Sequence, residues 1–212
     1  MLELNKKKEI IIIGYSGHSY EIIDTIINQG LKIKGYTDLS KKKNNPYKLE
    51  YLGDENKEDF KYLNDNYIFF IAIGDNLTRK NKSDFLDYKG LIQINVIHPD
   101  SSISKSTKMG VGNFISRNVS INNSVEIGNS VVINTAAIIE HDCKILDGVH
   151  VAPGAVLCGG VTVNKNSFIG ANSVINQNII IGEVVTIGSG SVVIRDLANG
   201  FTAYGNPAKS KS

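Results

Sequence analysis

An aliphatic residue recurs at every sixth position from residue 103 to residue 193, without a break. A mostly small or β-branched residue follows four positions after this anchor, and glycine or asparagine often comes directly after it. The period fits neither an amphipathic helix nor an alternating strand. It is typical of a parallel β-helix, in which each hexad forms one short strand and one turn. Three hexads make one triangular coil, so we expect the anchors to stack inside a prism. The anchors are Ile103, Met109, Ile115, Ile121, Ile127, Ile133, Ile139, Ile145, Val151, Leu157, Val163, Ile169, Ile175, Ile181, Ile187 and Val193.

The first hundred residues show a different pattern, in which strand-like and helix-like segments alternate. The predicted strands are 9–13, 32–37, 67–73 and 91–97, and the predicted helices are 20–28, a weak 57–63, and a helix capped by Asp75 or Asn76 that runs to about residue 88. This alternation predicts a small, Rossmann-like parallel α/β domain with right-handed crossovers. The change of pattern near Pro99 divides the chain into domains 1–98 and 99–212, and the second ends in an irregular tail.

The composition restricts the partners that the chain can have. A formal net charge of +2 at pH 7 gives no electrostatic reason to expect nucleic acid or an anionic membrane as a partner. The two cysteines, Cys143 and Cys158, make no disulfide framework, and Cys143 falls on an inward position of the hexads. The apolar run 10–13 is too short for a signal peptide or a membrane span, which predicts a soluble, cytoplasmic protein.

A glycine-containing turn, Gly14-Tyr15-Ser16-Gly17-His18, joins the first predicted strand to the first helix. Its free N–H groups and the positive end of the helix point to one place, which suits a phosphate or another anion. The dinucleotide fingerprint is incomplete, because Ser16 and Tyr20 stand at two of its glycine positions, so we expect no complete NAD site. Loops at the carboxyl ends of parallel strands gather ligand contacts. The residues expected around this crevice are Ser16, Gly17, His18, Thr37, Asp38 and Gly74. The alternative, that the turn only connects two elements, stays open.

One histidine of the hexad region stands between two carboxylates. His141 follows Glu140 and precedes Asp142 in the turn of a hexad, and an imidazole beside a carboxylate can act as a general base near neutral pH. His150, nine residues later, is expected on a neighbouring corner near the same groove. A corner histidine can equally be plain surface. The sequence shows no Cys/His spacing typical of zinc and no context for a serine nucleophile, so no metal is expected.

These features together resemble one family. They are the strand–turn–helix with Gly14-Tyr15-Ser16-Gly17-His18, the segment Ile-Ala-Ile-Gly-Asp-Asn at 71–76, the hexad prism, and Glu-His-Asp-Cys at 140–143. The chain is similar, from about Ile10 to Ala208, to the PglD/NeuD-like nucleotide-sugar and sialic-acid acetyltransferases. Members of this family N-acetylate UDP-4-amino sugars. The resemblance implies a homotrimer of left-handed β-helices, with acetyl-CoA in the groove between neighbouring prisms.

The resemblance also implies roles for particular residues. His141 would deprotonate the sugar amine, Asp142 would raise the basicity of His141, and Glu140 is the second candidate for orienting it. Asn134 would contact the sugar or the developing oxyanion. The residues expected at acetyl-CoA are His150, Ala171 and Ser189. The residues expected at the uridine diphosphate are Ser16, Gly17, His18, Thr37, Asp38 and Gly74. Family members often have two consecutive acidic residues where this chain has Thr37-Asp38, which leaves GDP, dTDP or CMP open as alternatives to UDP.

The expected function is acetyl-CoA-dependent N-acetylation of a nucleotide-linked amino sugar, a UDP-4-amino-4,6-dideoxy sugar, for a glycan or surface polysaccharide. O-acetylation of sialic acid is the alternative, because one histidine base serves amine and hydroxyl acceptors alike. A non-catalytic scaffold is a hypothesis of another class, which acetyl-CoA binding would test. A metal-dependent hydratase would need several histidines that converge between subunits, and the prism contains only His141 and His150.

Overall fold

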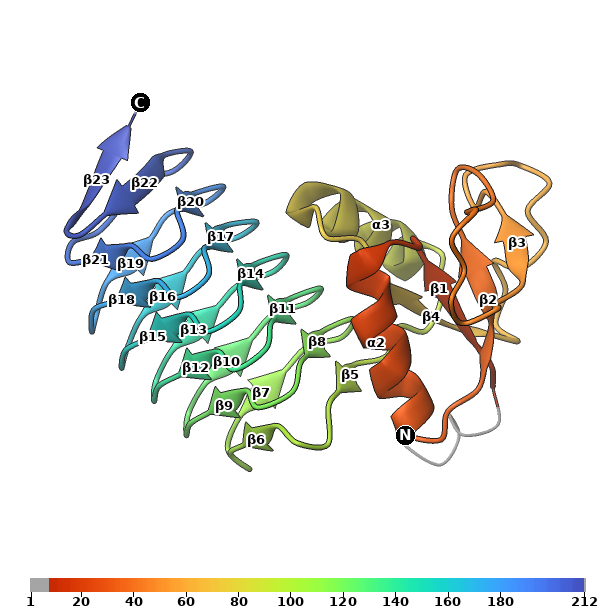
Figure 1. Ribbon diagram of the computed structural model, residues 1–212, viewed down its shortest axis with the longest axis horizontal. Coiled ribbons are helices and arrows are strands. Elements are labelled where there is room, and N and C mark those ends of the chain that lie inside the picture. Colours follow the sequence, from red (N-terminus) through yellow and green to blue (C-terminus); the bar gives the residue numbers. More distant parts are fainter. Residues whose placement is uncertain (1–7, 212) are drawn as a thin grey trace. The chain divides into compact units, whose positions relative to one another are not determined.

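The computed structural model describes residues 8–211, and these divide into two compact units (Figure 1). The first unit ends at Val96 and the second begins at Ile97. The first is a small α/β domain, and the second is a prism of short parallel strands. The change of pattern along the sequence therefore corresponds to a change of architecture.

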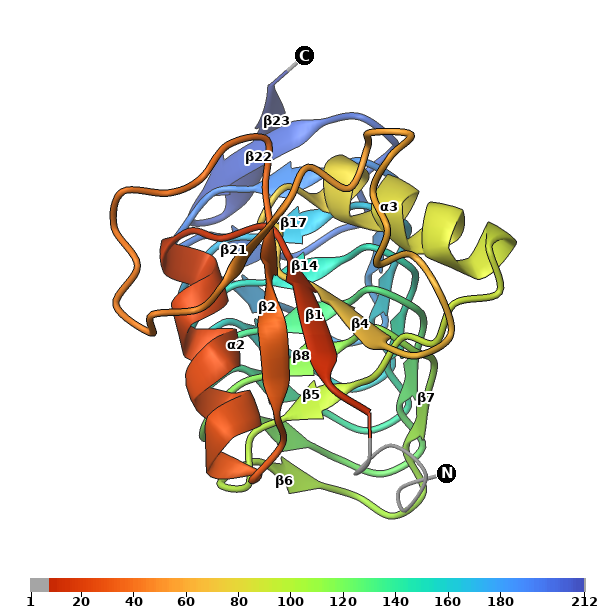
Figure 2. The ribbon, with the colours of Figure 1, turned by 90° about the vertical axis from the view of Figure 1, so that its right-hand side faces the viewer.

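The α/β domain is built on a four-stranded parallel sheet with the order β3-β2-β1-β4. Its strands are β1 (Ile10–Ile13), β2 (Ile33–Thr37), β3 (Tyr51–Gly53) and β4 (Ile68–Ile71). Figure 2 shows β2, β1 and β4 side by side. Every residue of β1 and β4 is buried. A strand that is covered on both faces has no polar face to alternate with, which explains the continuous apolar runs.

The two helices of this domain follow β1 and β4. Helix α2 (Gly17–Asn28) buries Ile22, Ile23 and Ile26 at helical spacing. Helix α3 (Asn76–Tyr88) has Asp75 as its N-cap, whose carboxylate accepts a hydrogen bond from the backbone N–H of Thr78 at 2.8 Å. Both loops between strand and helix lie at the carboxyl ends of the strands, where the crevice was expected.

Two predicted elements of this domain are wrong. Residues 57–63 form turns instead of a helix, because Asp54 accepts hydrogen bonds from both the backbone and the side chain of Asn56 and so favours a local turn. Residues 91–97 do not form the fourth strand: Gln93 makes only an isolated bridge to Phe69, and β5 (Val96–Ile97) lies at the end of a prism sheet. The fourth strand of the domain is β3, which the sequence did not predict.

The prism consists of two-residue strands, one in each hexad, as the period predicts. Its strands are β6 (Ser102–Ile103), β7 (Lys108–Met109), β8 (Phe114–Ile115), β9 (Ser120–Ile121), β10 (Glu126–Ile127), β11 (Val132–Ile133), β12 (Ile138–Ile139), β13 (Lys144–Ile145), β14 (His150–Val151), β15 (Val156–Leu157), β16 (Thr162–Val163), β17 (Phe168–Ile169), β18 (Val174–Ile175), β19 (Ile180–Ile181), β20 (Thr186–Ile187) and β21 (Val192–Val193). Successive strands fall in three different sheets, in which they pair in parallel, and form a left-handed β-helix. These sheets have six, five and eight strands, and the eight include β5 and the C-terminal strands β22 and β23. Paired residues such as Val132 and His150 differ by 150 − 132 = 18 positions, which is one coil.

The anchors stack inside the prism and make its core. They are fully or almost fully buried from Ile115 onward, whereas Ile103 and Met109, on the first coil, are only partly buried. The second inward row holds small residues, including Cys143, whose Sγ lies 3.2 Å from the carbonyl of Cys158. Large and small residues thus alternate around each coil, which lets the narrow prism fill its interior.

An antiparallel hairpin ends the prism (Figure 1). Strand β22 (Thr202–Gly205) pairs with β20 in parallel and with β23 (Ala208–Lys211) in antiparallel fashion, so the tail that was expected to be irregular is an ordered pair of strands. Across residues 8–211, neither helix is long and apolar enough to cross a membrane.

Candidate functional site

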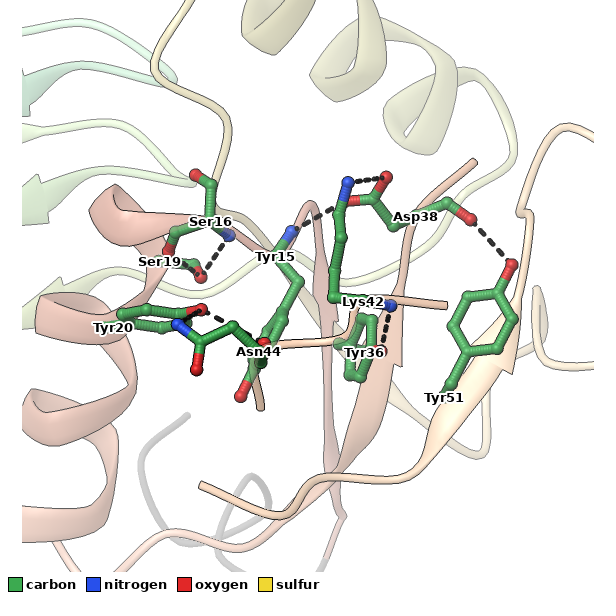
Figure 3. Close-up of polar contacts among 9 residues, drawn as sticks. All are labelled: Tyr15, Ser16, Ser19, Tyr20, Tyr36, Asp38, Lys42, Asn44 and Tyr51. Atoms are coloured by element: carbon green, nitrogen blue, oxygen red, sulfur yellow. Dashed lines mark hydrogen bonds and ion pairs between the residues drawn. The ribbon is translucent and has the colours of Figure 1, made fainter. Parts of the chain in front are cut away.

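The glycine turn of the α/β domain has a conformation that only glycine suits. Gly14 has φ +89°, and a Cβ there would lie 2.7 Å from Cγ1 of Ile73. The backbone N–H of Ser16 donates to Oγ of Ser19 at 2.9 Å, and that hydroxyl donates back to the carbonyl of Ser16 at 2.6 Å. Figure 3 shows these contacts. The turn therefore presents Ser16, which is exposed, at the start of α2.

Asp38 connects this turn to the segment after β2. Its Oδ2 accepts a hydrogen bond from the backbone N–H of Tyr15 at 3.1 Å, and its Oδ1 lies 2.8 Å from Nζ of Lys42 (Figure 3). Its backbone carbonyl accepts from the hydroxyl of Tyr51 at 3.0 Å. These contacts orient a carboxylate at the end of β2, the place where parallel α/β domains put the acidic residue that binds a ribose hydroxyl.

A pocket of about 310 Å³ lies at the carboxyl ends of these strands. It is lined by Gly14, Tyr15, Ser16, Asp38, Leu39, Glu55, Asn56, Ala72, Ile73, Gly74, Thr78 and Lys82. Of the residues expected around the crevice, Ser16, Asp38 and Gly74 line this pocket. Three predicted residues, Gly17, His18 and Thr37, are not part of the lining, and Thr37 is completely buried. Burial, followed by the nearby Arg79 guanidinium, lowers the pKa of His18, so it is neutral at physiological pH.

The buried side chain of Arg79 binds the loop between β4 and α3. Its side chain is 1% exposed and donates to the carbonyls of Ile73 at 3.1 Å and Gly74 at 2.9 Å, and to Oδ1 of Asn76 at 2.9 Å. Burial lowers the pKa of this guanidinium to about 10, which still leaves it charged at neutral pH. The loop that carries Gly74 into the pocket is therefore held by charge-assisted hydrogen bonds.

A second pocket, of about 640 Å³, shares one wall with the first. The shared residues are Glu55, Asn56, Thr78 and Lys82. Lys82 forms an ion pair with Glu55 and donates to Oδ1 of Asn56. The sequence did not single out these residues, because β3 was not predicted. The rule of carboxyl ends would have placed Glu55, two residues after β3, in the crevice.

In the prism, His141 lies at the corner between β12 and β13 with its side chain 58% exposed. Its Nδ1 is 2.9 Å from Oδ2 of Asp142. A carboxylate can only accept, so Nδ1 carries the hydrogen and Nε2 keeps its lone pair. The ring lies against Gly159 on the next coil, where a Cβ would come within 2.6 Å of Cε1 and 2.7 Å of Nε2. The imidazole is therefore held between a carboxylate and a bare stretch of backbone.

The two candidates for orienting His141 are distinguished by their partners. Oε2 of Glu140 accepts a hydrogen bond from the side chain of Asn122 at 2.8 Å, one coil away. Asp142 contacts the imidazole directly and has φ +61°, a conformation that aspartate tolerates better than most residues. Asp142 is thus the residue that fixes the ring.

The expectation that His150 lies on a neighbouring corner near the same groove is wrong for a single chain. His150 lies within β14, in the eight-stranded sheet, and the corner of His141 lies between the six-stranded and five-stranded sheets. Nine residues are half of an 18-residue coil, so the two histidines are on opposite sides of the prism. His150 is almost buried, and its ring contacts Phe168 edge-on at 5.1 Å between centroids.

The other predicted prism residues gather at a different corner. The side-chain amide nitrogen of Asn134 lies 3.5 Å from Nε2 of His150, and its oxygen accepts from the backbone N–H of Thr135 at 2.7 Å. Ala171 and Ser189 follow β17 and β20, and they stack on successive coils, since Gly190 donates to the carbonyl of Ala171 at 2.8 Å. These residues share the corner between the eight-stranded and six-stranded sheets.

Comparisons with known proteins agree with this architecture. Residues 9–86 match the PglD N-terminal domain family. A histidine-to-asparagine variant of perosamine N-acetyltransferase from Caulobacter crescentus, in complex with CoA and GDP-perosamine, is 29% identical over 96% of this chain and 97% of its own, with a TM-score of 0.88. The acetyltransferase domain of PglB from Neisseria gonorrhoeae is 26% identical over 96% of this chain and 100% of its own, with a TM-score of 0.90. The α/β domain therefore matches the PglD N-terminal domain family, and the whole chain is similar in structure to these acetyltransferases.

Other comparisons define how far the likeness extends. WeeI from Acinetobacter baumannii, at 24% identity over 96% of this chain and 100% of its own, has a TM-score of 0.87 and supports the fold. No curated protein matches the sequence significantly. Within residues 8–211, no group of three or more His, Cys, Asp or Glu side chains is placed to hold a metal ion.

Proposed function

We propose that the protein transfers the acetyl group of acetyl-CoA to the amine of a nucleotide-linked amino sugar. The observation that carries the proposal is the His141–Asp142 pair, held over Gly159 at an exposed corner of the prism. Perosamine N-acetyltransferase, similar over nearly the whole chain, was crystallised with CoA and a GDP-linked amino sugar. The product would enter a glycan or surface polysaccharide, and the reaction would take place in the cytoplasm.

In the reaction, the sugar amine attacks the thioester carbonyl while Nε2 of His141 takes the proton that the nitrogen loses. The new N–C bond forms, the C–S bond breaks, and the proton passes from the imidazolium to the departing thiolate. Asp142 stabilises the imidazolium in between, because its carboxylate accepts the Nδ1 hydrogen. A positioned base of this kind contributes typically 10²–10⁴-fold. Thiolate is a good leaving group, so direct transfer suffices.

The α/β domain would bind the nucleotide. The exposed turn at Ser16 places the positive end of α2 at the diphosphate, and Asp38 offers a carboxylate to the ribose. Gly74, in the loop between β4 and α3, lines the same pocket. Binding energy from these remote contacts supports orientation of the amine at His141. We therefore assign nucleotide binding to the first domain and acetyl transfer to the second.

We also propose that the active enzyme is a homotrimer. The outward residues of the six-stranded sheet are apolar over four coils, at Ile138, Val156, Val174 and Val192. Those of the five-stranded sheet are charged and exposed over the first three coils, at Lys108, Glu126 and Lys144, and Thr162 and Ile180 follow. The six-stranded sheet is therefore the better subunit contact, because its apolar surface would leave water.

A trimer built on this face would complete the site. His141 stands at one edge of the six-stranded sheet, and Asn134, Ala171 and Ser189 stand at the opposite edge. Threefold packing brings one edge of each prism against the opposite edge of the next. His141 of one copy and His150, Ala171 and Ser189 of a neighbour would then flank one acetyl-CoA groove, although they are far apart within a chain.

Replacement of His141 by alanine tests the proposal. The substrates are acetyl-CoA with GDP-, UDP- and dTDP-4-amino sugars, and with free and CMP-linked sialic acid, and the readout is release of the free thiol. We expect turnover with one amino-sugar nucleotide and a loss of at least about 10²-fold in His141→Ala, with the oligomeric state unchanged. Unchanged turnover in the variant would exclude His141 as the base, and turnover with sialic acid alone would make the enzyme an O-acetyltransferase.

A further inference from the structure

The wall between the two pockets of the α/β domain contains a buried ion pair. Glu55 is 7% exposed, and its Oε1 is 2.5 Å from Nζ of Lys82, whose side chain is 19% exposed. Both residues line both pockets. Glu55 follows β3, Lys82 lies on α3, and the first pocket also contains the turn at Gly14 and Ser16. The pair and the anion-binding turn thus face the same space.

Stability alone does not explain this pair. Taking two charges out of water costs about as much as their attraction returns, so a buried ion pair is weak evidence for a structural role. Glu55 also keeps one carboxylate oxygen that no other described side chain binds, since the recorded ion pair uses only the other oxygen. Asn56, in contrast, is held on both sides, by Asp54 and by Lys82. The charged groups that this wall presents to a ligand belong to Glu55 and Lys82.

The pair presents an ordered set of hydrogen-bonding groups. Lys82 is a donor. The carboxylate of Glu55 supplies two acceptors, which are the oxygen outside the ion pair and the remaining lone pair of the oxygen within it. Guanine has the complementary edge, with the acceptor O6 followed by the donors N1–H and N2–H. Uracil and thymine place a carbonyl where the second donor is needed, so a carboxylate oxygen would face another oxygen. Cytosine and adenine place a ring nitrogen acceptor against the carboxylate.

We propose that Lys82 and Glu55 read the nucleobase and select a guanine nucleotide. This inference rests on the proposed function, since it assigns the base of the same nucleotide-linked substrate. The neighbouring pocket, lined in part by Phe60 and Phe85, gives the larger purine ring room beyond the pair. The assignment replaces uracil, the base expected from the sequence, with guanine.

The test is a binding comparison on the full-length protein, by isothermal titration calorimetry with GDP, IDP, UDP, dTDP and CDP. IDP is GDP without the 2-amino group, so it removes one of the two donors to Glu55 without any change in the protein. We expect GDP to bind roughly 5- to 150-fold more tightly than UDP, as for a good bidentate contact to a base. We expect IDP to bind about tenfold more weakly than GDP.

Glu55→Gln should remove the preference for GDP over UDP and the preference for GDP over IDP, because an amide puts an N–H where the carboxylate had an acceptor. The matched control is Glu50→Gln, which also removes a carboxylate from a lysine ion pair, with Lys34, outside both pockets. It should bind all five nucleotides as the unmodified protein does. Should Glu55→Gln fail to fold, the comparison of GDP with IDP binding to the unmodified protein still tests whether the protein reads the 2-amino group of guanine.

Two failures are distinguishable. Tight binding of UDP, dTDP or CDP in preference to GDP, or equal binding of GDP and IDP, would overturn guanine reading and leave the nucleotide-linked acceptor in place. Binding of none of the five diphosphates would contradict both the base assignment and the proposed acceptor.

Discussion

Gly159→Ala should inactivate the enzyme without unfolding it. The new Cβ would stand 2.6 Å from Cε1 and 2.7 Å from Nε2 of His141. Ordinary carbon contacts begin at about 3.5 Å, so the imidazole must move by about 0.9 Å. The ring is exposed and can move at little energetic expense, and Gly159 does not need a positive φ. The equivalent corner position one coil further on is Gln177, so this backbone accepts a side chain.

The loss of activity follows from the displacement. A misplacement of about 1 Å in a catalytic group can reduce the rate about 10²-fold, which corresponds to about 2.7 kcal/mol in the activation free energy. We therefore expect kcat/KM for acetyl transfer, measured by thiol release, to fall about 10²-fold in Gly159→Ala. Thermal unfolding followed by circular dichroism should be nearly unchanged.

Two further variants separate a moved imidazole from general damage. Gln177→Ala changes the equivalent corner one coil away and should keep full activity. Combining Gly159→Ala with His141→Ala should lower the rate no further than His141→Ala does, because the displaced group is already absent. Retention of more than half the activity in Gly159→Ala, or an additional loss in the double variant, would refute the reasoning.

Three other predictions concern single side chains. Asp142→Asn should lower kcat/KM about tenfold or more. Glu140→Gln should change kcat/KM by no more than about threefold, because Glu140 is hydrogen-bonded to Asn122 and not to the imidazole. Equal losses of kcat/KM in the two variants, measured in steady-state assays, would contradict this. Burial raises the pKa of Cys143 to about 11, so its thiol stays protonated at pH 8, and a thiol reagent should modify only Cys158 until the protein is denatured. Arg79→Met should lower the free energy of unfolding in urea by about 2–4 kcal/mol by leaving buried carbonyls unpaired, and weaken nucleoside diphosphate binding; an unchanged midpoint would show that the loop does not need its brace.

The sequence predicts the prism almost completely, because every hexad repeats the same local pattern of buried residues. Each hexad buries one large anchor and one small residue, so strand positions, inward residues and corners all follow from the period. The position of Cys143 inside the core follows directly. The C-terminal hairpin does not, because it lies outside the repeat and its pairing is set by the last coil it covers.

The α/β domain is less predictable because long-range pairing determines its elements. Strand β3 has only three half-buried residues and forms by pairing with β2, so β-propensity alone does not predict it. Its absence from the prediction removed Glu55 from the expected crevice. Thr37 does not line the pocket for another reason. Neighbouring residues at a strand end point to opposite faces, and the sequence does not say that Thr37 faces inward and Asp38 outward.

The 18-residue coil fixes which side chains lie above one another on the prism. Six extra residues between His141 and Gly159 would turn every later side chain onto the next face, and the glycine would no longer lie beneath the imidazole. Whole coils gained or lost elsewhere leave that pair in phase, since each coil contacts only its neighbours. Insertions and deletions in the prism are therefore expected in multiples of 18 residues.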